Sequence, residues 1–242
     1  MAEVAYPQVM TDLETLSSAE NYKKWLYSNV EDVLGNRILE IGSGIGNMTP
    51  LLGAHGKMLV TDMDEAYIQT LRGRFDGDPD MSVHPYVLGG EDNAIPEFIR
   101  AFEPDTIVCL NVLEHVEDDM NAVRTMVDML APGGHLVMVL PALMVLFGDL
   151  DRQYGHFRRY NRSAAVRLVA ALPRASLIRN RYMNLVGVAG WWVNHVLLKR
   201  TQLSPMQVQT FDRYLAPIAR FCERIVPPAC GLSLVVWIRK DG

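Results

Sequence analysis

The sequence predicts an α/β fold in which a doubly wound parallel sheet is covered by helices. Short apolar runs alternate with helix-like stretches, and these runs are apolar on both faces, as in strands buried between two layers of helices. Glycines follow directly after the first run. The chain has 242 residues, of which 49% are hydrophobic and 21% charged, so we expect one domain with an ordinary globular core.

Seven apolar runs are expected as strands. In chain order they span residues 37–41, 57–61, 81–87, 105–110, 135–140, 176–182 and 232–238. The clearest helix is expected over residues 116–130, where apolar residues recur three and four positions apart. The sequence Pro132-Gly133-Gly134 ends that pattern, because proline and glycine do not continue a helix.

Composition restricts the classes of partner. The net charge is −5, which disfavours nucleic acid as a partner, because a nucleic-acid binder normally carries a basic surplus. The three cysteines, Cys109, Cys222 and Cys230, form no CxxC pair and no disulfide framework. We therefore expect a reduced, cytoplasmic setting and no metal site.

Two apolar stretches bear on membrane association. Residues 135–147 and 183–198 are both shorter than the roughly 20 residues that a membrane span needs. We expect no transmembrane segment and no targeting segment. The second stretch is followed by Lys199 and Arg200, which leaves a contact with a membrane surface open.

The most informative stretch is the turn after the first strand, which contains Gly42, Gly44 and Gly46. Alternate glycines permit a tight turn and a close approach of the backbone to a ligand. Asp62 stands twenty residues after Gly42, at the end of the second strand. A carboxylate there can accept both ribose hydroxyls of an adenosine, so the sequence predicts an adenosine-containing ligand at this turn.

Glu40 stands two residues before the first glycine, and the resulting pattern E-x-G-x-G-x-G resembles motif I of the class I S-adenosylmethionine-dependent methyltransferases. Dinucleotide-binding enzymes use G-x-G-x-x-G instead. The resemblance implies that Glu40 lies near the methionine part of the donor and that the three glycines lie beneath it. It also implies that Asp62 binds the ribose, that Met63 lies against the adenine, and that the fold is a Rossmann-like sheet of seven mostly parallel strands with the last one antiparallel.

The likeness extends along the chain. Residues 105–116 are similar to the fourth-strand motif of the small-molecule branch of the family, which implies a donor contact for Asn111. One feature departs from the family, because Leu88-Gly89-Gly90 separates the third strand from Glu91 and Asp92. The sequence therefore assigns no partner to the adenine amine.

The loop after the fifth strand is predicted to carry the chemistry, because loops at the carboxyl ends of central strands border the ligand crevice. His156 is predicted as the base that removes the acceptor's proton, since an imidazole titrates near neutral pH. Asp151 is predicted to hold the tautomer of His156 and Tyr160 to orient His156 or the substrate, with His115 as the next candidate base. Ordinary structural roles stay open as well: a helix cap for His156, a turn for Asp151 and a loop position for His115.

The wider pattern, from Gly155-His156-x-Arg158-Arg159-Tyr160 onward, resembles a bacterial small-molecule subgroup that includes natural-product enzymes. Aromatic residues suit a flat acceptor, and the acceptor side is rich in them: Phe147, Tyr154, Phe157, Tyr160, Tyr182, Trp191 and Trp192. We expect C-methylation of an electron-rich, indole-like natural product, with O- or N-methylation of a natural product or glycan intermediate as the alternative. The other classes are a non-catalytic nucleotide-binding subunit and an NAD oxidoreductase.

The single domain, residues 1–242, divides by role. Residues 1–34 are expected to form an N-terminal helical lid whose Tyr22 touches the donor, S-adenosylmethionine. Residues 35–148 form the donor-binding core, residues 149–230 the acceptor-side loop and helical insertion, and residues 231–242 the final strand. We expect a small-molecule acceptor and a monomer or homodimer.

Overall fold

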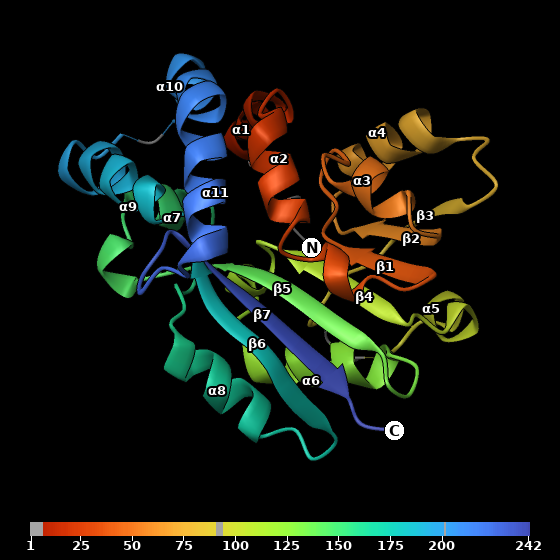
Figure 1. Ribbon diagram of the computed structural model, residues 1–242. Helices are drawn as coiled ribbons and strands as arrows, with labels where there is room; N and C mark the ends of the chain where they lie inside the picture. Colours follow the sequence, from red (N-terminus) through yellow and green to blue (C-terminus); the bar gives the residue numbers. More distant parts are fainter. Residues whose placement is uncertain (1–6, 91–93, 201) are drawn as a thin grey trace.

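A seven-stranded sheet in the order β3-β2-β1-β4-β5-β7-β6 forms the centre of the molecule (Figure 1). The computed structural model describes residues 7–90, 94–200 and 202–242. Neighbouring strands among β1 to β5 pair in parallel, and β7 pairs antiparallel with both β5 and β6. The predicted Rossmann-like sheet is therefore confirmed. The strands are β1 (Arg37–Ile41), β2 (Lys57–Asp62), β3 (Met81–Pro85), β4 (Thr106–Leu110), β5 (His135–Pro141), β6 (Ala175–Met183) and β7 (Ser233–Lys240).

Helices cover both faces of the sheet. One face packs against α2 (Glu20–Tyr27), α3 (Thr49–Gly53), α4 (Glu65–Phe75) and α11 (Ala216–Ile225), and the other against α5 (Glu97–Phe102), α6 (Asp119–Met129) and α8 (Arg162–Ala170). Successive strand residues point to opposite faces, so Ile38 belongs to the first core and Leu39 to the second. Both are fully buried, which explains why the strands read as continuous apolar runs.

Several element boundaries differ from the sequence expectation by one to three residues, and two of these differences have a clear physical reason. The helix expected from residue 116 begins at Asp119, because the carboxylate of Asp118 caps it by accepting the N–H of Asn121 at 3.1 Å. The third strand ends at Pro85 rather than at residue 87, because its partner strand ends at Asp62.

The N-terminal segment forms α1 (Pro7–Ser17), α2 and a 3₁₀ turn, η1 (Glu31–Val33). Helix α2 belongs to the core, since its Trp25 is 1% exposed. Trp237 of the final strand donates its indole N–H to the carbonyl of Asn29 at 3.0 Å, just after α2. Helix α1 lies outside this layer and contacts α10 (Pro205–Thr210). Residues 1–6 of the expected lid lie outside the described residues, and the lid function stays a prediction.

The segment between β5 and β6 contains η3 (Met144–Leu146), α7 (Asp149–Gln153) and α8. Between β6 and β7 the chain forms the helical insertion of α9 (Leu185–Trp191), η4 (Trp192–Leu197), α10, η5 (Phe211–Leu215) and α11. Of these helices, α10 and α11 stand beside α1 and α2 (Figure 1). In the described part of the chain, every helix is too short or too polar to cross a bilayer.

Replacing Trp25 by Ala is expected to lower the free energy of unfolding by about 3–5 kcal/mol, because truncating a buried Trp leaves a cavity between α2 and the sheet. Urea denaturation followed by circular dichroism measures this change. Tyr214→Ala is the matched control, since Tyr214 is 58% exposed, and it should change stability by less than about 0.5 kcal/mol. Equal stability of the two variants would show that α2 is not part of the core.

Candidate functional site

The turn after β1 depends on glycine. Gly42, Gly44 and Gly46 have φ angles of +71°, +55° and +78°, which lie in the left-handed region that other L-residues rarely adopt. The N–H groups of Gly42 and Ser43 donate to the carbonyl of Thr61 on β2 at 2.9 and 3.0 Å. The turn is thus held against the end of the neighbouring strand, with its backbone in the shape that the motif requires.

Asp62 connects β2 to this turn. One carboxylate oxygen accepts the N–H of Gly44 at 2.8 Å, and the other accepts the N–H of Asp64 at 3.0 Å. Burial raises the pKa of Asp62, although these backbone hydrogen bonds oppose the increase. The next residue, Met63, is 65% exposed and lies on the surface beside the carboxylate.

Glu40 lies beneath the other side of the turn. It is 3% exposed, and its carboxylate accepts the hydroxyl of Thr49, the first residue of α3, at 2.6 Å. Burial raises the pKa of Glu40 to about 7. A cationic ligand beside Glu40 would favour its ionised form, and S-adenosylmethionine carries such a charge on its sulfonium.

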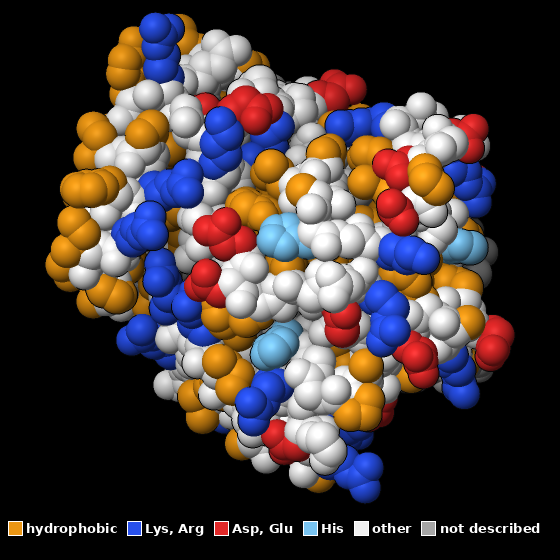
Figure 2. All heavy atoms as spheres, turned by 45° about the vertical axis from the view of Figure 1, so that its right-hand side comes forward, with side chains coloured by type: hydrophobic (Ala, Val, Ile, Leu, Met, Phe, Trp, Pro, Cys, Tyr) orange, Lys and Arg blue, Asp and Glu red, His pale blue; other side chains and the backbone are white. Residues whose placement is uncertain are grey.

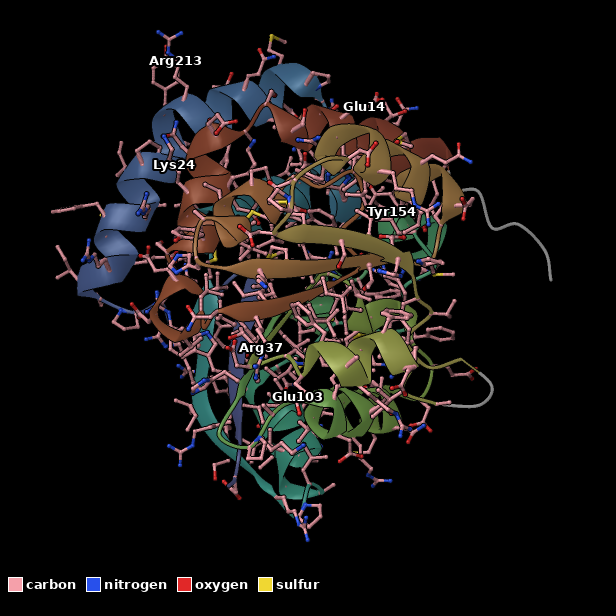
Figure 3. All side chains as sticks on the ribbon, turned by 90° about the vertical axis from the view of Figure 1, so that its right-hand side faces the viewer. Glu14, Lys24, Arg37, Glu103, Tyr154 and Arg213 are labelled. Carbon is pink, nitrogen blue, oxygen red and sulfur yellow. The ribbon has the colours of Figure 1, made fainter. Side chains whose placement is uncertain are left out.

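Helix α1 lies over the glycine turn. Asn47 donates its side-chain N–H to the carbonyl of Leu13 at 3.0 Å, and a Cβ added to Gly44 would lie 3.1 Å from Cδ1 of Leu13. The adjacent Asp12 accepts the hydroxyl of Tyr154. Figure 3 shows Tyr154 near Glu14 of α1 and away from Arg37 and Glu103. Helix α1 therefore contacts both the glycine turn and the loop that follows β5.

The loop after β4 continues the site. Asn111 has a φ of +53° and donates its backbone N–H to the carbonyl of Val139 on β5 at 2.8 Å. The next residue, Val112, packs so closely on the glycine turn that a Cβ added to Gly42 would collide with it. The 3₁₀ turn η2 (Leu113–His115) begins at the residue after Val112, so it follows directly on a residue that packs against the glycine turn.

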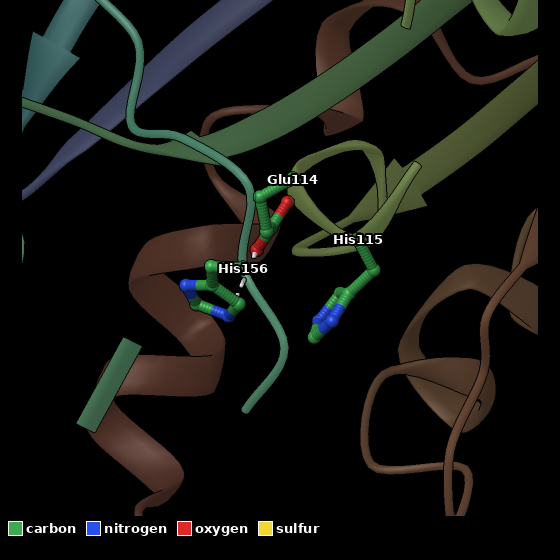
Figure 4. Close-up of side chains that lie close together, drawn as sticks. All are labelled: Glu114, His115 and His156. Atoms are coloured by element: carbon green, nitrogen blue, oxygen red, sulfur yellow. Dashed lines mark ion pairs between the residues drawn. The ribbon is translucent and has the colours of Figure 1, made fainter. Parts of the chain in front are cut away.

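Glu114, His115 and His156 form a cluster at this point (Figure 4). Nε2 of His156 lies 4.0 Å from Oε1 of Glu114, and the ring centroids of the two histidines are 4.6 Å apart in an edge-on arrangement. The backbone N–H of Phe157 donates to the carbonyl of Glu114 at 2.8 Å. This bond ties the loop after β5 to the loop after β4.

Asp151 fixes the orientation of His156. Its carboxylate lies 3.0 Å from Nδ1 of His156 and accepts two N–H groups of Arg159, at 2.8 and 3.1 Å, and the backbone N–H of Gly148 at 2.9 Å. Burial alone would raise the pKa of Asp151, but these hydrogen bonds and the charge of Arg159 hold it below its usual range. Because an ionised carboxylate only accepts, Nδ1 of His156 carries a proton, and Nε2 of the same ring faces Glu114.

Glu114 and His115 are mostly neutral near pH 7. Burial raises the pKa of Glu114 to about 8, and neither oxygen of this carboxyl group has a hydrogen-bond partner among the described residues. Desolvation, together with the nearby imidazole of His156, lowers the pKa of His115 to about 4, although part of His115 reaches the surface. Sequence reasoning quoted Glu114 as part of the fourth-strand motif but gave it no role. The signal that could have identified it is a Glu-His pair a few residues after a buried strand.

Two predicted site residues have other contacts. Tyr160 is 2% exposed and donates its hydroxyl to Asp119 at 3.0 Å, at the start of α6, so this group is engaged away from His156. Tyr22 packs edge-on against Trp25 and Phe211. The predicted orienting role of Tyr160 and the predicted donor contact of Tyr22 stay predictions.

The remaining acidic candidates beyond the third strand, Glu91 and Asp92, lie outside the described residues. The described part of this loop ends in Leu88-Gly89-Gly90, whose Leu88 packs into the core. The partner of the adenine amine therefore stays unassigned.

The raised pKa of Glu114 makes stability depend on pH. A group whose pKa is higher in the folded state contributes stability below its unfolded value, and this contribution is lost as pH rises through the folded value. The free energy of unfolding should therefore decline between the ordinary value of 4.5 and about 8. Glu114→Gln, which cannot ionise, should decline less when denaturation is compared at the two ends of this range, whereas Glu117→Gln, at an exposed position, should follow the wild type. Identical slopes for wild type and Glu114→Gln would contradict the assignment.

Comparison with known proteins places part of the chain in a known domain family. A family model described as a methyltransferase domain matches residues 39–136. A tRNA U34 carboxymethyltransferase of Pseudoalteromonas translucida (strain TAC 125) is 26% identical over 193 residues, which cover 78% of this chain and 53% of the relative. The ubiquinone/menaquinone biosynthesis C-methyltransferase UbiE of Cronobacter sakazakii is 26% identical over 153 residues, covering 60% and 58%. The chain thus spans about half the length of the curated relatives it matches.

Solved structures share the fold. The N-methyltransferase NodS from Bradyrhizobium japonicum WM9, in complex with S-adenosyl-L-homocysteine, superposes with a TM-score of 0.57 at 18% identity. The superposition covers 93% of this chain and 88% of NodS. The family match, the seven-stranded sheet and the glycine turn identify residues 39–136 as a methyltransferase domain with the fold of the class I S-adenosylmethionine-dependent methyltransferases.

Proposed function

We propose that this protein transfers the methyl group of S-adenosylmethionine to a small-molecule acceptor bound between the glycine turn and His156. One observation carries the proposal: a histidine with its tautomer set by the buried Asp151 lies on the loop after β5. The bond from Phe157 to Glu114 holds this loop beside the loop after β4, whose Val112 packs on Gly42. Donor turn and base are therefore parts of one packed unit.

Methyl transfer is an in-line displacement. The acceptor atom forms a bond to the methyl carbon as the bond from that carbon to sulfur breaks, and the sulfur keeps the electron pair as S-adenosylhomocysteine. Positioning of the two reactants dominates such a step. Nε2 of His156 takes the proton of the acceptor, and the carboxylate of Asp151 stabilises the imidazolium that forms.

Two kinds of atom are candidates for accepting the methyl group: an aromatic carbon, and the oxygen or nitrogen of a hydroxyl or amine. The aromatic side chains named from the sequence favour an electron-rich carbon, as in an indole-like natural product. The His156–Asp151 pair favours the alternative, a hydroxyl or amine, because such a nucleophile must lose a proton, whereas a carbon nucleophile loses its proton after attack. The structure also places several of these aromatic residues elsewhere, since Tyr160 and Tyr182 lie in the core and Trp191 packs over the guanidinium of Arg159 at 4.5 Å.

One relative is named as a tRNA enzyme, so the nature of the acceptor is itself part of the proposal. The net charge of −5 argues for a small molecule over a polyanionic tRNA in this chain. An assay that offers a small-molecule library and bulk tRNA side by side, with labelled donor, separates the two. Label incorporated into tRNA would replace the small-molecule assignment.

The donor assignment depends on Asp62. Asp62→Ala should weaken binding of S-adenosylmethionine by about 1.5–3 kcal/mol, because it removes a charge-assisted pair with the ribose and a hydrogen bond that shapes the turn. Isothermal titration calorimetry measures the change, and Asp64→Ala, which also touches this loop, is the control. Unchanged affinity in Asp62→Ala, or tighter binding of NAD, would contradict the donor site.

The base assignment depends on His156. His156→Ala should lower the rate of methyl transfer about 10²–10⁴-fold while donor affinity stays near the wild-type value, because the donor turn is separate from this side chain. His55→Ala, which removes an exposed histidine, is the matched control. Near-normal turnover of His156→Ala would return this residue to a structural role, and His115 would be tested next.

The same cluster offers the nitrogen and carboxylate groups of a divalent cation site, since its three candidate ligand atoms lie within 4.8 Å of one another. Dialysis against EDTA distinguishes a cation from a free base. If His156 acts as a metal-free base, the rate of methyl transfer stays unchanged after dialysis. Loss of activity that Mn²⁺ or Zn²⁺ restores would assign Glu114, His115 and His156 to metal binding instead.

A further inference from the structure

The helical insertion, residues 185–226, turns apolar side chains outward. Surface helices normally bury their apolar stripe and expose polar residues. Here large apolar side chains are exposed along η4, α10 and α11, with 59% of Leu197, 75% of Met206, 63% of Ile218, 66% of Phe221, 66% of Ile225 and 70% of Val226 accessible.

Helix α11 shows the inversion most clearly. Its inward face consists of Ala216, Ala219 and Glu223, which are at most 5% exposed. Its outward face carries Ile218 and Phe221, the same face on which Ile225 lies. The carboxylate of Glu223 is therefore buried, whereas the bulky apolar residues of this helix are exposed. Exposed apolar side chains contribute no hydrophobic burial to the stability of the fold.

The buried acids explain how the insertion is held in this orientation. Glu223 accepts the backbone N–H groups of Asn184 and Leu185, at 3.1 and 2.8 Å, at the start of α9. Asp212 accepts the backbone N–H groups of Asn21 and Tyr22, at 3.3 and 2.7 Å, on α2. Polar contacts fasten these helices to the body of the protein and leave the apolar face free of internal packing.

The exposed charges of the insertion are all positive. Lys199, Arg200, Arg213, Arg220 and Arg224 are its basic residues, and its two acids, Asp212 and Glu223, are the buried ones just described. The whole chain carries a net charge of −5, so this segment is opposite in sign to the rest. In Figure 2 hydrophobic side chains form the outer edge of the left flank, and a column of Lys and Arg side chains lies beside them.

A hollow at the base of α11 adds to this charge. It has a volume of about 160 Å³, and Arg179 and Arg181 of β6 line it together with Arg220 and Arg224, opposite Glu31 and Asp32. Asp32 pairs with Arg179 at 3.4 Å. Nε of Arg181 is buried and has no hydrogen-bond partner among the described residues, so it could satisfy an anionic oxygen that enters the hollow.

We propose that the helical insertion binds the surface of an anionic phospholipid bilayer. Apolar side chains flanked by cationic ones are the chemistry of an interfacial helix, in which the apolar face enters the acyl boundary and the basic residues meet the phosphates. A second copy of the chain is a poorer occupant. A twofold dimer would place the same arginines of both copies against one another, and like charges oppose that contact.

Flotation with vesicles tests the proposal on the full chain. The protein is expected to float with vesicles that contain phosphatidylglycerol, to bind phosphatidylcholine vesicles far less, and to detach as salt is raised. The double variant Phe221→Ser/Ile225→Ser should weaken partitioning at least about tenfold, as should Arg220→Gln/Arg224→Gln. Val145→Ser and Arg167→Gln, which change exposed residues elsewhere, should bind like the wild type.

Thermal unfolding and donor affinity, which should be unchanged in all four variants, show that they are folded. Absence of flotation with anionic vesicles would overturn the proposal, as would equal, salt-independent binding to neutral ones. Analytical ultracentrifugation gives the remaining outcome. A dimer that the Phe221→Ser/Ile225→Ser variant dissociates, without vesicle binding, would assign this face to a second copy of the chain.

Discussion

Four parallel strands end at one edge of the sheet, and the side chains of the site lie at or just beyond those ends. Glu40 and Asp62 lie at the ends of β1 and β2, Asn111 directly follows β4, and the loop with Asp151 follows β5. Register between the strands brings these ends together, since residues of β1 pair directly with residues of β2 and β4. The site therefore follows from the direction of the strands more than from any single contact.

Burial of charge at this edge is balanced in two different ways. Asp151 is ionised and is offset by Arg159, which is itself 6% exposed, so the pair is retained at a high desolvation cost. Among the described residues, no hydrogen-bond partner offsets a charge on Glu114, and its carboxyl group therefore stays mostly protonated near pH 7. His156 therefore lies between two different carboxyl groups: Asp151 is an ionised acceptor, and Glu114 is a neutral acid.

Much of the fold was predictable from local pattern. The first strand has the bounds expected from its apolar run, and the glycine turn and Asp62 lie where the motif predicts, because both depend on residues close in sequence. The orphaned carboxyl of Glu114 was not predictable, because its environment is assembled from a loop some forty residues later in the chain.

Helix α11 shows a second limit of sequence pattern. The spacing of Ile218, Phe221 and Ile225 indicates that these residues share a helix face, and a shared apolar face normally packs inward. The structure turns this face outward, because Glu223 and Asp212 make their hydrogen bonds on the other side. Periodicity specifies which residues share a helix face, but it does not specify whether that face is buried or exposed.

Helix α1 connects the glycine turn, the loop after β5 and the helical insertion by hydrogen bonds. Through Leu13 it contacts Asn47 on the donor turn, and through Asp12 it contacts Tyr154 on the acceptor loop and the N–H of Leu203 in the insertion. The predicted lid therefore has a mechanical requirement: a helix that opens for exchange of the donor must also break its contacts with the loop after β5 and with the insertion. Under that prediction, release of S-adenosylhomocysteine and release of the methylated product are interdependent, because both depend on the opening of one helix.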